Sequence, residues 1–477
     1  MENNWDPNAF LSAQFIIHRK VLQSPTMNNF TELSSGVNYL ASPSIWRETM
    51  HKELEENFLY QQYTSLEGFQ TTRYAIKLYE KFLFSRGNLF FKADFDVCMT
   101  IGASQAADYA LDYCRTIGKR KMLLVGLTYP LYATLGEKYG YIMMEARSAH
   151  INRDLPTVDE LIRTMVFFQP DIIVLCHPAN PSGEKYTDEE LDIILSELSR
   201  KDIYCIFDCA CNIVISKRPT TTPEPFLLKH KMIHKSIIIN SFSKTESIPG
   251  FRIGYIVGNY NLIQFVKEKQ VTIMNPPNIP AIAVWMIMLF RCLHLSEQFG
   301  LGERDRQTVI RYYKKMYMFT TLLCPVQIRE YINNLMDNRL ISEYLKYKQE
   351  LFSEEMIINS NKEYISKRLY DYIKEATTMD SGFNYLIKLK TYQNSDEMKL
   401  CEAILRETGI AIFTESGFAL NKANQRDYWI RISLALPEYQ FHTAVDKLYF
   451  FINKTMMPKE QDNNCTSIEE NEKLYNQ

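Results

Sequence analysis

Residues 236–254 read SIIINSFSKTESIPGFRIG, and this stretch decides the class of fold. Its run of isoleucines is typical of a strand buried on both faces of a sheet. Lys244 follows that strand, so we expect it at a carboxyl strand end, where open α/β sheets bind their ligands. A lysine that is partly desolvated there, beside another cation, has a lowered pKa and can attack carbonyl groups.

The second half of this stretch suits an anion. Arg252 supplies a guanidinium, Gly250 and Gly254 allow a tight turn, and Ser241 adds a hydroxyl. Arginine binds phosphate through two parallel hydrogen bonds, so the combination fits a phosphate dianion beside the reactive lysine. Taken alone, the stretch also fits a surface loop with an incidental lysine and arginine.

Six further apolar runs alternate with helical patterns along the first half of the chain. They cover residues 96–102, 121–127, 140–146, 171–177, 203–208 and 252–258. Together with the isoleucine run they predict a mostly parallel seven-stranded sheet between helices, which is an α/β fold. After residue 260 the sequence changes to long amphipathic helices, followed by a smaller α+β pattern.

The length of 477 residues and a hydrophobic content of 46% predict two domains. We expect an N-terminal segment, 1–55, that contributes to the smaller domain, and a large domain over 56–320. The smaller C-terminal domain is expected over 321–455, with a helical insertion at about 300–375. Residues 456–477 are polar and low in aromatics, so we predict a disordered tail.

Composition argues for a small-molecule partner. The chain has 54 basic and 56 acidic residues, a formal net charge of −2, which favours neither nucleic acid nor an anionic membrane. Its ten cysteines are scattered without metal-type spacing, which indicates a reducing compartment and no metal site. The N-terminus has no signal-peptide pattern, and the longest apolar run, from Ile279, is too short to span a bilayer, so we expect a cytoplasmic protein.

The stretch 236–254 also matches a family signature, S-x-S-K-x(5)-G-x-R-x-G. The matching residues are Ser241, Ser243, Lys244, Gly250, Arg252 and Gly254. The chain therefore resembles the class I and II aminotransferase family, whose members use pyridoxal 5′-phosphate (PLP) on the fold of aspartate aminotransferase, fold type I. The resemblance implies that Lys244 forms a Schiff base with PLP and that Ser241, Ser243 and Arg252 help to bind it.

Two more segments recur in the family's order. Asp208 ends the apolar run 203–208, and the resemblance implies that it keeps the PLP ring nitrogen protonated. Asn180 lies in HPANPSG, which resembles the family's N-P-[TS]-G segment. Its amide would bond the cofactor's ring oxygen and approach the substrate carboxylate. Seen singly, Asp208 also fits a helix cap and Asn180 also fits a plain turn.

Upstream residues would complete the cofactor site. Gly102, Ala103 and Ser104 stand at a predicted strand-to-helix turn, where backbone N–H groups and the helix dipole bind phosphate. By resemblance they hold the PLP phosphate. Tyr129 occupies the place of the family's aromatic residue that stacks on the pyridine ring, with Tyr132 as the alternative.

Three residues are implied to serve the substrate or the partner subunit. Arg431 lies within a predicted strand, where a buried arginine requires an anion, and by resemblance it binds the substrate α-carboxylate. Gly36 is the expected pocket residue of the N-terminal segment. Tyr63 begins a match to Y-x(4)-G-x(4)-R-x-A-I, whose tyrosine reaches the neighbouring subunit's phosphate in the family, so we expect a homodimer; it also fits a structural helix start.

The chain departs from the family at two places. Cys211 stands where most relatives have a tyrosine that donates to the PLP phenolate oxygen, and a thiol is a weaker donor than a phenol. We expect this change to keep the Schiff base protonated to a higher pH. The stretch between Lys244 and Arg431 is also longer than usual, because of the insertion at about 300–375, which could select a substrate or extend the dimer surface.

The resulting hypothesis is an aminotransferase that acts on an α-amino acid and a 2-oxo acid with ping-pong kinetics. The main alternative keeps PLP but changes the outcome to elimination, cyclisation or oxidation of an amino acid, as in an ACC-synthase-like lyase. A regulatory protein that kept only the fold is disfavoured because the cofactor residues are all present. No second arginine is placed for a dicarboxylate, so aspartate or glutamate is not favoured as substrate.

Overall fold

The computed structural model of the chain describes residues 9, 11–13, 16, 30–56, 63–92, 94–212, 221–273, 281–320, 325–390, 397–421 and 429–456. The predicted tail lies outside these residues except for Met456. The same holds for most of the first 29 residues of the predicted N-terminal segment.

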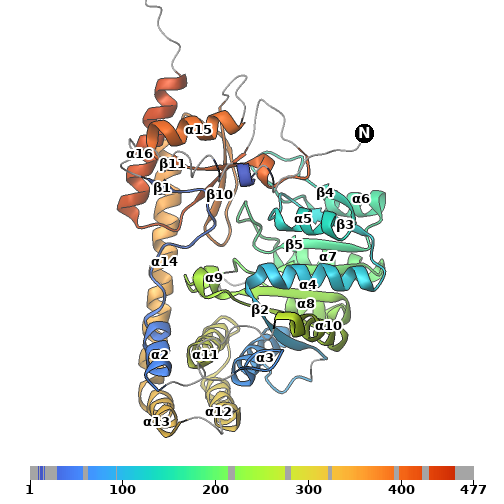
Figure 1. Cartoon of the computed structure of the whole chain (residues 1–477), viewed down its shortest axis with the longest axis vertical. Coiled ribbons are helices and arrows are strands. Elements are labelled where there is room, and N and C mark those ends of the chain that lie inside the picture. The colour runs from blue at the N-terminus through green and yellow to red at the C-terminus, as the bar shows by residue number, and fades with distance from the viewer. Residues whose placement is uncertain are drawn as a thin grey trace, which may run out of the picture.

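A seven-stranded sheet forms the larger of the two halves of the molecule (Figure 1). Its strands are β2 (Asp96–Ile101), β3 (Lys121–Val125), β4 (Ile142–Ala146), β5 (Ile172–Cys176), β6 (Tyr204–Asp208), β7 (Ser236–Ser241) and β8 (Ile253–Gly258). Their spatial order is β2-β8-β7-β6-β5-β3-β4, and only β8 runs antiparallel to its neighbours. Each predicted apolar run contains one of these strands, so the predicted α/β fold is confirmed.

Helices cover both faces of this sheet. One face carries α4 (Gly102–Thr116), α5 (Leu131–Lys138) and α10 (Tyr260–Gln270). The other carries α3 (Gln70–Phe84), α6 (Val158–Phe168), α7 (Asp188–Arg200), α8 (Glu224–Lys229) and α11 (Ala281–Gln298). The sheet is therefore buried on both sides, which is why its strands read as continuous apolar runs.

Local sequence explains how several of these helices form. Thr157 and Thr187 begin α6 and α7 with capping boxes, in which each threonine side chain accepts from the N–H group of a glutamate three residues on. Residues 281–296 of α11 are all buried, and the stretch from Ala281 to Phe290 is apolar throughout. Such a helix belongs in the interior rather than at the surface.

A second, antiparallel sheet has the order β12-β13-β10-β9. Its strands are β9 (Ile373–Ala376), β10 (Asn384–Leu389), β12 (Phe413–Thr414) and β13 (Trp429–Ser433), and a parallel pair of β1 (Thr31–Glu32) and β11 (Ile410–Ala411) lies beside it. The helices α15 (Glu397–Thr408) and α16 (Glu438–Met456) pack on this sheet, and their side chains share its core. This is the predicted α+β pattern.

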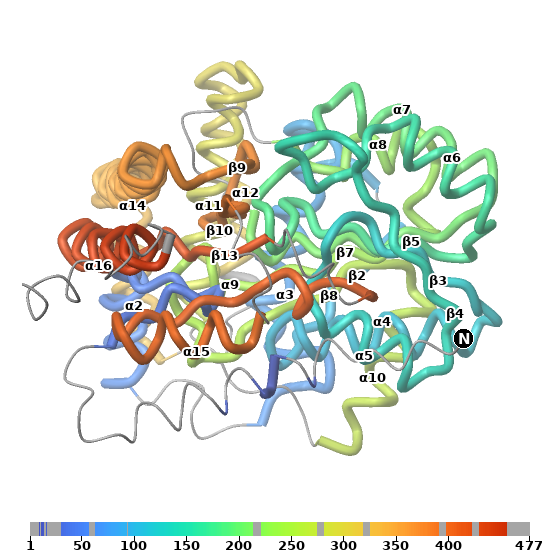
Figure 2. Tube along the Cα trace, turned by 90° about the horizontal axis from the view of Figure 1, so that it is seen from above, coloured from blue at the N-terminus to red at the C-terminus, as the bar shows by residue number. Residues whose placement is uncertain are grey.

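The helix α14 (Leu340–Arg368) connects the two halves (Figure 1). It is seen lengthwise in Figure 1 and nearly end-on in Figure 2. Tyr347 and Leu351, in its first half, pack in the core of the larger sheet, whereas Ile358 and Ile365, in its second half, pack in the core of the smaller one. A single rigid element therefore contacts both cores.

The predicted insertion is helical over most of its length. It contains α12 (Glu303–Thr320), α13 (Val326–Asn334), the short π-helix η4 (Leu335–Arg339) and α14. At its lower end it meets α2 (Ser44–Glu55), where Arg339 bonds Glu48. The remaining described elements are the short helix α9 (Phe242–Thr245) and the 3₁₀ helices η1 (Ile233–Lys235), η2 (Pro249–Phe251), η3 (Val271–Ile273) and η5 (Glu415–Gly417). The exact domain boundaries stay a prediction.

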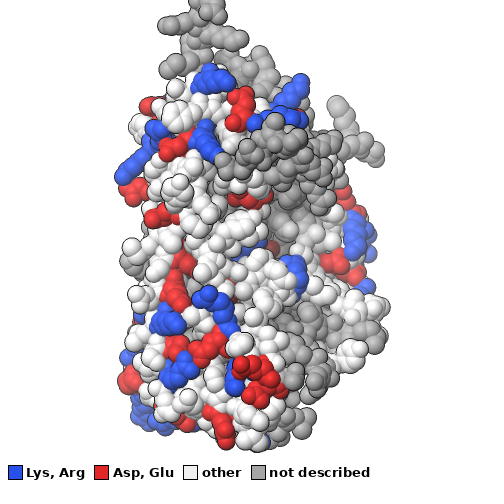
Figure 3. All heavy atoms as spheres, turned by 60° about the vertical axis from the view of Figure 1, so that its left-hand side comes forward, with Lys and Arg blue, Asp and Glu red and all other residues white. Residues whose placement is uncertain are grey.

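Charges of both signs alternate on the face that Figure 3 shows. On α14 and the elements that pack beside it, opposite charges form the pairs Arg339–Glu343, Lys348–Glu297 and Lys314–Asp337. This face therefore offers no large surface of one sign. In the part of the chain that is described, no helix combines the length and apolarity needed to cross a membrane.

Candidate active site

Lys244 lies one turn beyond the carboxyl end of β7, in the short helix α9 (Phe242–Thr245). Ser241 caps this helix: its side chain accepts from the N–H group of Ser243 at 3.0 Å. The Lys244 ammonium donates to the carbonyl of Gly36. Burial is the main cause that lowers the pKa of Lys244 below its ordinary value, and nearby arginines lower it further. The fold thus places a poorly solvated amine at the end of a strand.

A cavity of about 350 Å³ opens around this amine between the two halves of the molecule. Twelve of the predicted site residues line it: Gly36, Ala103, Ser104, Tyr129, Asn180, Asp208, Cys211, Ser241, Ser243, Lys244, Arg252 and Arg431. They come from the carboxyl ends of β2, β3, β5, β6 and β7, from the residue before β8, from the middle of β13 and from the segment after β1. The fold therefore brings together residues that lie up to 395 positions apart.

One end of the cavity is built to attract an anion. The guanidinium of Arg252 lies against the first residue of α4, where a Cβ atom added to Gly102 would stand 2.6 Å from Nη2 of Arg252. A Cβ atom on Gly254 would stand 2.4 Å from the carbonyl carbon of Gly102, so β8 passes directly under the start of the helix. Two glycines thus place a guanidinium beside a helix N-terminus. The guanidinium and the helix N-terminus both carry positive charge, and an anion bound between them would relieve their repulsion.

Asp208 forms the floor of the cavity at the end of β6. Its Oδ1 accepts from the N–H group of Ala210 at 3.0 Å, and its Oδ2 accepts from the hydroxyl of Tyr132 at 2.9 Å. Burial raises the pKa of Asp208, while these two donors and Lys244 oppose the rise. The carboxylate is therefore held in a fixed orientation toward the cavity.

The two tyrosines near β3 have different positions. Tyr129 is 38% exposed and lines the cavity, as the sequence predicted. Tyr132, the predicted alternative for ring stacking, is fully buried, and it is not among the residues found to line the cavity. It lies in the first turn of α5, three residues after Tyr129, and its hydroxyl donates to Asp208. Tyr132 thus binds the carboxylate, and it is not placed to stack on a ring in the cavity.

The opposite end of the cavity holds a buried guanidinium that lacks a full set of partners. Arg431, on β13, donates through Nη1 to Oδ1 of Asn180 at 3.1 Å and through Nη2 to the carbonyl of Ser34. Its Nε has no partner among the described residues. Burial lowers the pKa of Arg431 to about 10. A buried guanidinium with an unused donor and no carboxylate partner in the described residues fits an incoming carboxylate.

Two phenylalanines shape this end further. The guanidinium carbon of Arg431 lies 4.7 Å from the ring centre of Phe418 and 5.5 Å from that of Phe413. Both rings also line the cavity, together with Leu11. Sequence reasoning missed these residues and the Ser34 carbonyl. Phe413 within GIAIFTESG and Phe418 directly after it were a visible signal, but nothing local to them indicates that they reach Arg431.

Cys211 lines the cavity at the predicted position. Burial raises the pKa of its thiol to about 11, although Lys244 lowers it. The thiol therefore stays protonated near neutral pH. It can donate only the weak hydrogen bond of a sulfur atom.

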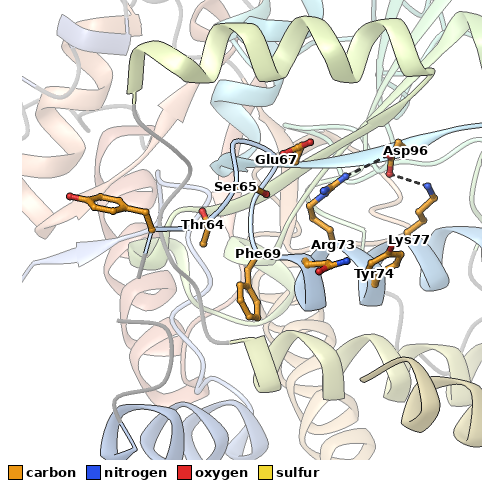
Figure 4. A pocket seen from close by; sticks show the side chains of 10 residues that line it. Thr64, Ser65, Glu67, Phe69, Arg73, Tyr74, Lys77 and Asp96 are labelled. Carbon is orange, nitrogen blue, oxygen red and sulfur yellow. Dashed lines mark hydrogen bonds and ion pairs between the residues drawn. The ribbon is translucent and has the colours of Figure 1, made fainter. Parts of the chain in front are cut away.

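Two predicted residues do not line this cavity. Gly102 lies just behind it, against Arg252. Tyr63 is 90% exposed and belongs to a separate cavity of about 450 Å³. In that cavity Arg73 and Lys77 point toward Asp96, at 3.5 and 3.1 Å (Figure 4). Within one chain, Tyr63 therefore does not reach Lys244.

Residues 28–448 match the model of the family described as aminotransferase class I and II. The chain belongs to this family. Among solved structures it resembles an aminotransferase from Mycobacterium tuberculosis, with a TM-score of 0.65 and 18% identity, covering 93% of this chain and 96% of that one. A double mutant of Thermus thermophilus aspartate aminotransferase gives a TM-score of 0.66 at 16% identity, over 92% and 96% of the two chains. These likenesses confirm the fold predicted for this family member.

Curated relatives match over shorter stretches. A probable N-acetyl-LL-diaminopimelate aminotransferase of Bacillus subtilis is 26% identical over 226 residues, which is 47% of this chain and 54% of the relative. Histidinol-phosphate aminotransferase 2 of Bacillus cereus is 29% identical over 163 residues, 34% of this chain and 41% of the relative. The chain thus spans about half the length of the curated relatives that it matches.

Proposed function

We propose that this family member is a PLP-dependent aminotransferase that transfers the amino group of an α-amino acid to a 2-oxo acid. The observation that carries the proposal is the cavity around Lys244. It combines a poorly solvated amine, an oriented carboxylate, an anion site and an under-bonded guanidinium. Family membership supports the same chemistry.

The anion site and Asp208 fit the cofactor. Arg252, Ser241 and the N–H groups at the start of α4 would hold a phosphate, and Asp208 would face the protonated nitrogen of a pyridine ring. Tyr129 would contact the flat face of the ring, and Asn180 and Cys211 its oxygen. When bound, PLP supplies an aldehyde carbon for attachment of amines and a ring that withdraws electrons from the bond to be broken.

Lys244 would have two tasks. Its Nζ would hold the cofactor before substrate arrives, and afterwards it would accept and return the substrate's α-proton. Both tasks need the unprotonated amine, and the burial that lowers the pKa of Lys244 increases the fraction present in that form at neutral pH. The contact of Nζ with the Gly36 carbonyl keeps the amine on the cavity side.

Arg431 would orient the substrate. Its guanidinium would bind the α-carboxylate and so fix the α-carbon between itself and Lys244. In the described lining of the cavity the only other cations are Lys244 and Arg252, and each already has a task. The neighbouring Phe413, Phe418 and Leu11 are apolar. We therefore propose an amino acid with an uncharged side chain as the preferred donor.

An assay of amino transfer tests this function. The purified protein with PLP is incubated with single amino acids, with and without a 2-oxo acid, and both products are measured. Transfer requires the 2-oxo acid for multiple turnovers and gives ping-pong kinetics. Sustained product formation without the 2-oxo acid would instead establish elimination, cyclisation or oxidation. No turnover of any amino acid by PLP-loaded protein would contradict the proposal.

We further propose a homodimer in which Tyr63 serves the partner's site, and a cytoplasmic location. The high exposure of Tyr63 supports the first point. Seven described cysteines, Cys98, Cys114, Cys176, Cys205, Cys209, Cys211 and Cys292, are free thiols, which supports the second. Mixing inactive Lys244→Ala and Tyr63→Ala proteins tests the dimer, because a hybrid contains one site with both residues intact. Activity should return on mixing; two inactive proteins that stay inactive after verified subunit exchange would refute the role of Tyr63.

A further inference from the structure

The helix that carries Lys244 is too short to hold itself in place. α9 has four residues, which is one turn, and an isolated turn of helix is unstable. Because the lysine side chain is long and flexible, the position of its Nζ depends on where the backbone of this turn is fixed. Contacts that fix the turn therefore bear directly on the chemistry proposed for Lys244.

One buried arginine contacts residues on both sides of Lys244. Arg291, on α11, is 2% exposed. Its Nη2 donates to Oγ1 of Thr245 at 2.8 Å and to Oε1 of Glu246 at 2.6 Å. Its guanidinium carbon also lies 5.4 Å from the ring centre of Phe242. Arg291, which is not among the residues found to line the cavity, thus contacts residues that precede and follow Lys244.

A second helix joins the same cluster. The hydroxyl of Tyr347, on α14, donates to Oε1 of Glu246 at 3.0 Å, and Tyr347 and Glu246 are each 1% exposed. From the other direction Nδ2 of Asn38 donates to the backbone carbonyl of Lys244 at 3.1 Å. The Lys244 turn is therefore held by α11, by α14 and by the segment after β1.

The same helix contacts the strand that carries Arg431. Fourteen residues beyond Tyr347, Nδ2 of Asn361 donates to the carbonyls of Leu434 and Leu436 at 2.8 and 2.9 Å. These carbonyls directly follow β13. α14 thus links the turn of Lys244 to the strand of Arg431, the two groups between which the substrate's α-carbon would be held.

We propose that Arg291, Glu246 and Tyr347 are positioning residues for Lys244, which we call the Lys244 anchor. The anchor fixes the backbone of α9 relative to β13 and thereby sets the distance between the Lys244 amine and Arg431. An apolar pair of the same volume could fill this space equally well, so a buried ion pair here is explained by geometry rather than by stability. The proposal rests on the proposed function, because it concerns the same amine.

The chain supplies a matched control for Tyr347. One turn earlier on α14, the hydroxyl of Tyr344 donates to Oε1 of Glu297 at 2.8 Å, and Glu297 lies on α11. Tyr344→Phe therefore removes the same type of tyrosine–glutamate bond from the same helix, α14, without touching the Lys244 turn. Tyr347→Phe removes the bond to Glu246. A purely structural role of Tyr347 would give the two variants similar properties.

The test follows PLP attachment rather than turnover. Cofactor-free wild type, Tyr347→Phe, Tyr344→Phe and the double variant Arg291→Met/Glu246→Leu are mixed with PLP. The rate of attachment is measured from the change in absorbance. For each loaded protein, a pH titration then gives the pH at which half of the absorbance change has occurred. Thermal unfolding gives the midpoint temperature of each variant. Tyr347→Phe should attach PLP at least about fivefold more slowly and shift that pH, whereas Tyr344→Phe should match wild type in both.

The double variant separates positioning from stability. It should keep a thermal midpoint near that of wild type, because both charges are removed together, yet attach PLP as slowly as Tyr347→Phe or more slowly. Wild-type attachment by a stable double variant, or equal effects of Tyr347→Phe and Tyr344→Phe, would overturn the anchor. Failure of the wild type itself to attach PLP would overturn the proposed function and the anchor with it, so the two failures are distinguishable.

Discussion

Two buried arginines, Arg291 and Arg431, show how this molecule treats the same charge in two ways. Arg291 is 2% exposed and bonds the carboxylate of Glu246, which raises its pKa despite burial. Arg431 is 4% exposed, has no carboxylate among its described partners, and has a pKa lowered to about 10 by burial. Burial alone therefore does not identify a ligand site. What distinguishes Arg431 is that the protein leaves its charge uncompensated.

The largest effect is expected from removing the compensated arginine. Arg291→Met leaves Glu246 as a buried charge without its ion-pair partner, and it should lower the free energy of unfolding by about 3–5 kcal/mol. Denaturant unfolding measures the change. Addition of Glu246→Leu should recover most of it. A single variant as stable as wild type would show that the pair is not the compensated site described here.

Removing the uncompensated arginine should affect catalysis instead. Arg431→Met should lower kcat/KM for α-amino acids about 100-fold, because a charged hydrogen-bond pair to the substrate is lost. Its free energy of unfolding should change by less than about 1 kcal/mol, since a desolvated charge is removed. Amines without a carboxylate should be transferred at unchanged rates by this variant. If Arg431→Met lost as much stability as Arg291→Met, Arg431 would also be compensated by the protein, which would contradict the difference between the two arginines.

A buried carboxylate extends the comparison to anions. Glu53 on α2 accepts from the N–H groups of Ala281 and Ile282 at 2.9 and 3.1 Å, and burial raises its pKa to about 8. The folded chain therefore binds more protons than the unfolded chain between about pH 4.5 and 8, so stability falls as pH rises through this window and then levels off. The slope from this group is at most about 1.4 kcal/mol per pH unit. Glu53→Gln should remove that part of the slope in unfolding experiments at pH 5.5 and 8; an identical slope in the variant would refute it.

The smallest expected effect concerns Asp208. Tyr132→Phe removes one of the two donors that hold its carboxylate, which should raise the pKa of Asp208 further. We expect kcat to fall about fivefold, consistent with the loss of one hydrogen bond to a charged group. Steady-state kinetics from pH 6 to 9 would show this fall in kcat. The control is Tyr139→Phe, which loses a tyrosine–aspartate bond to Asp108 on α4. Equal losses in both variants would contradict a specific role of Tyr132.

Features that depend on neighbouring residues were predictable from the sequence. The seven strands follow from short apolar runs; Asp208 ends one of them, and Asn180 and Lys244 follow two others within a few residues. Because parallel strands end at the same edge of a sheet, such residues meet whatever the length of the intervening helices. The family resemblance added Arg431, which lies on the second sheet.

Features that depend on distant segments were not predictable. Phe418 reaches Arg431, and Arg291 reaches Glu246, only after two separate elements have packed. Tyr129 precedes α5 and Tyr132 lies in its first turn, and the sequence does not reveal which of the two faces the cavity without knowledge of the sheet that α5 packs on. The anchor of Lys244 by α14 arises within the helical insertion, whose place in the fold no local pattern indicates.

The most direct test of the central claim, that Lys244 is the reactive amine of this cavity, is to locate PLP on the chain. The wild-type protein is loaded with PLP, reduced with borohydride, digested and analysed by mass spectrometry. We expect one pyridoxyl group, on the peptide that contains Lys244, and none there in Lys244→Arg. A label on another lysine, or an undiminished yield from Lys244→Arg, would contradict it.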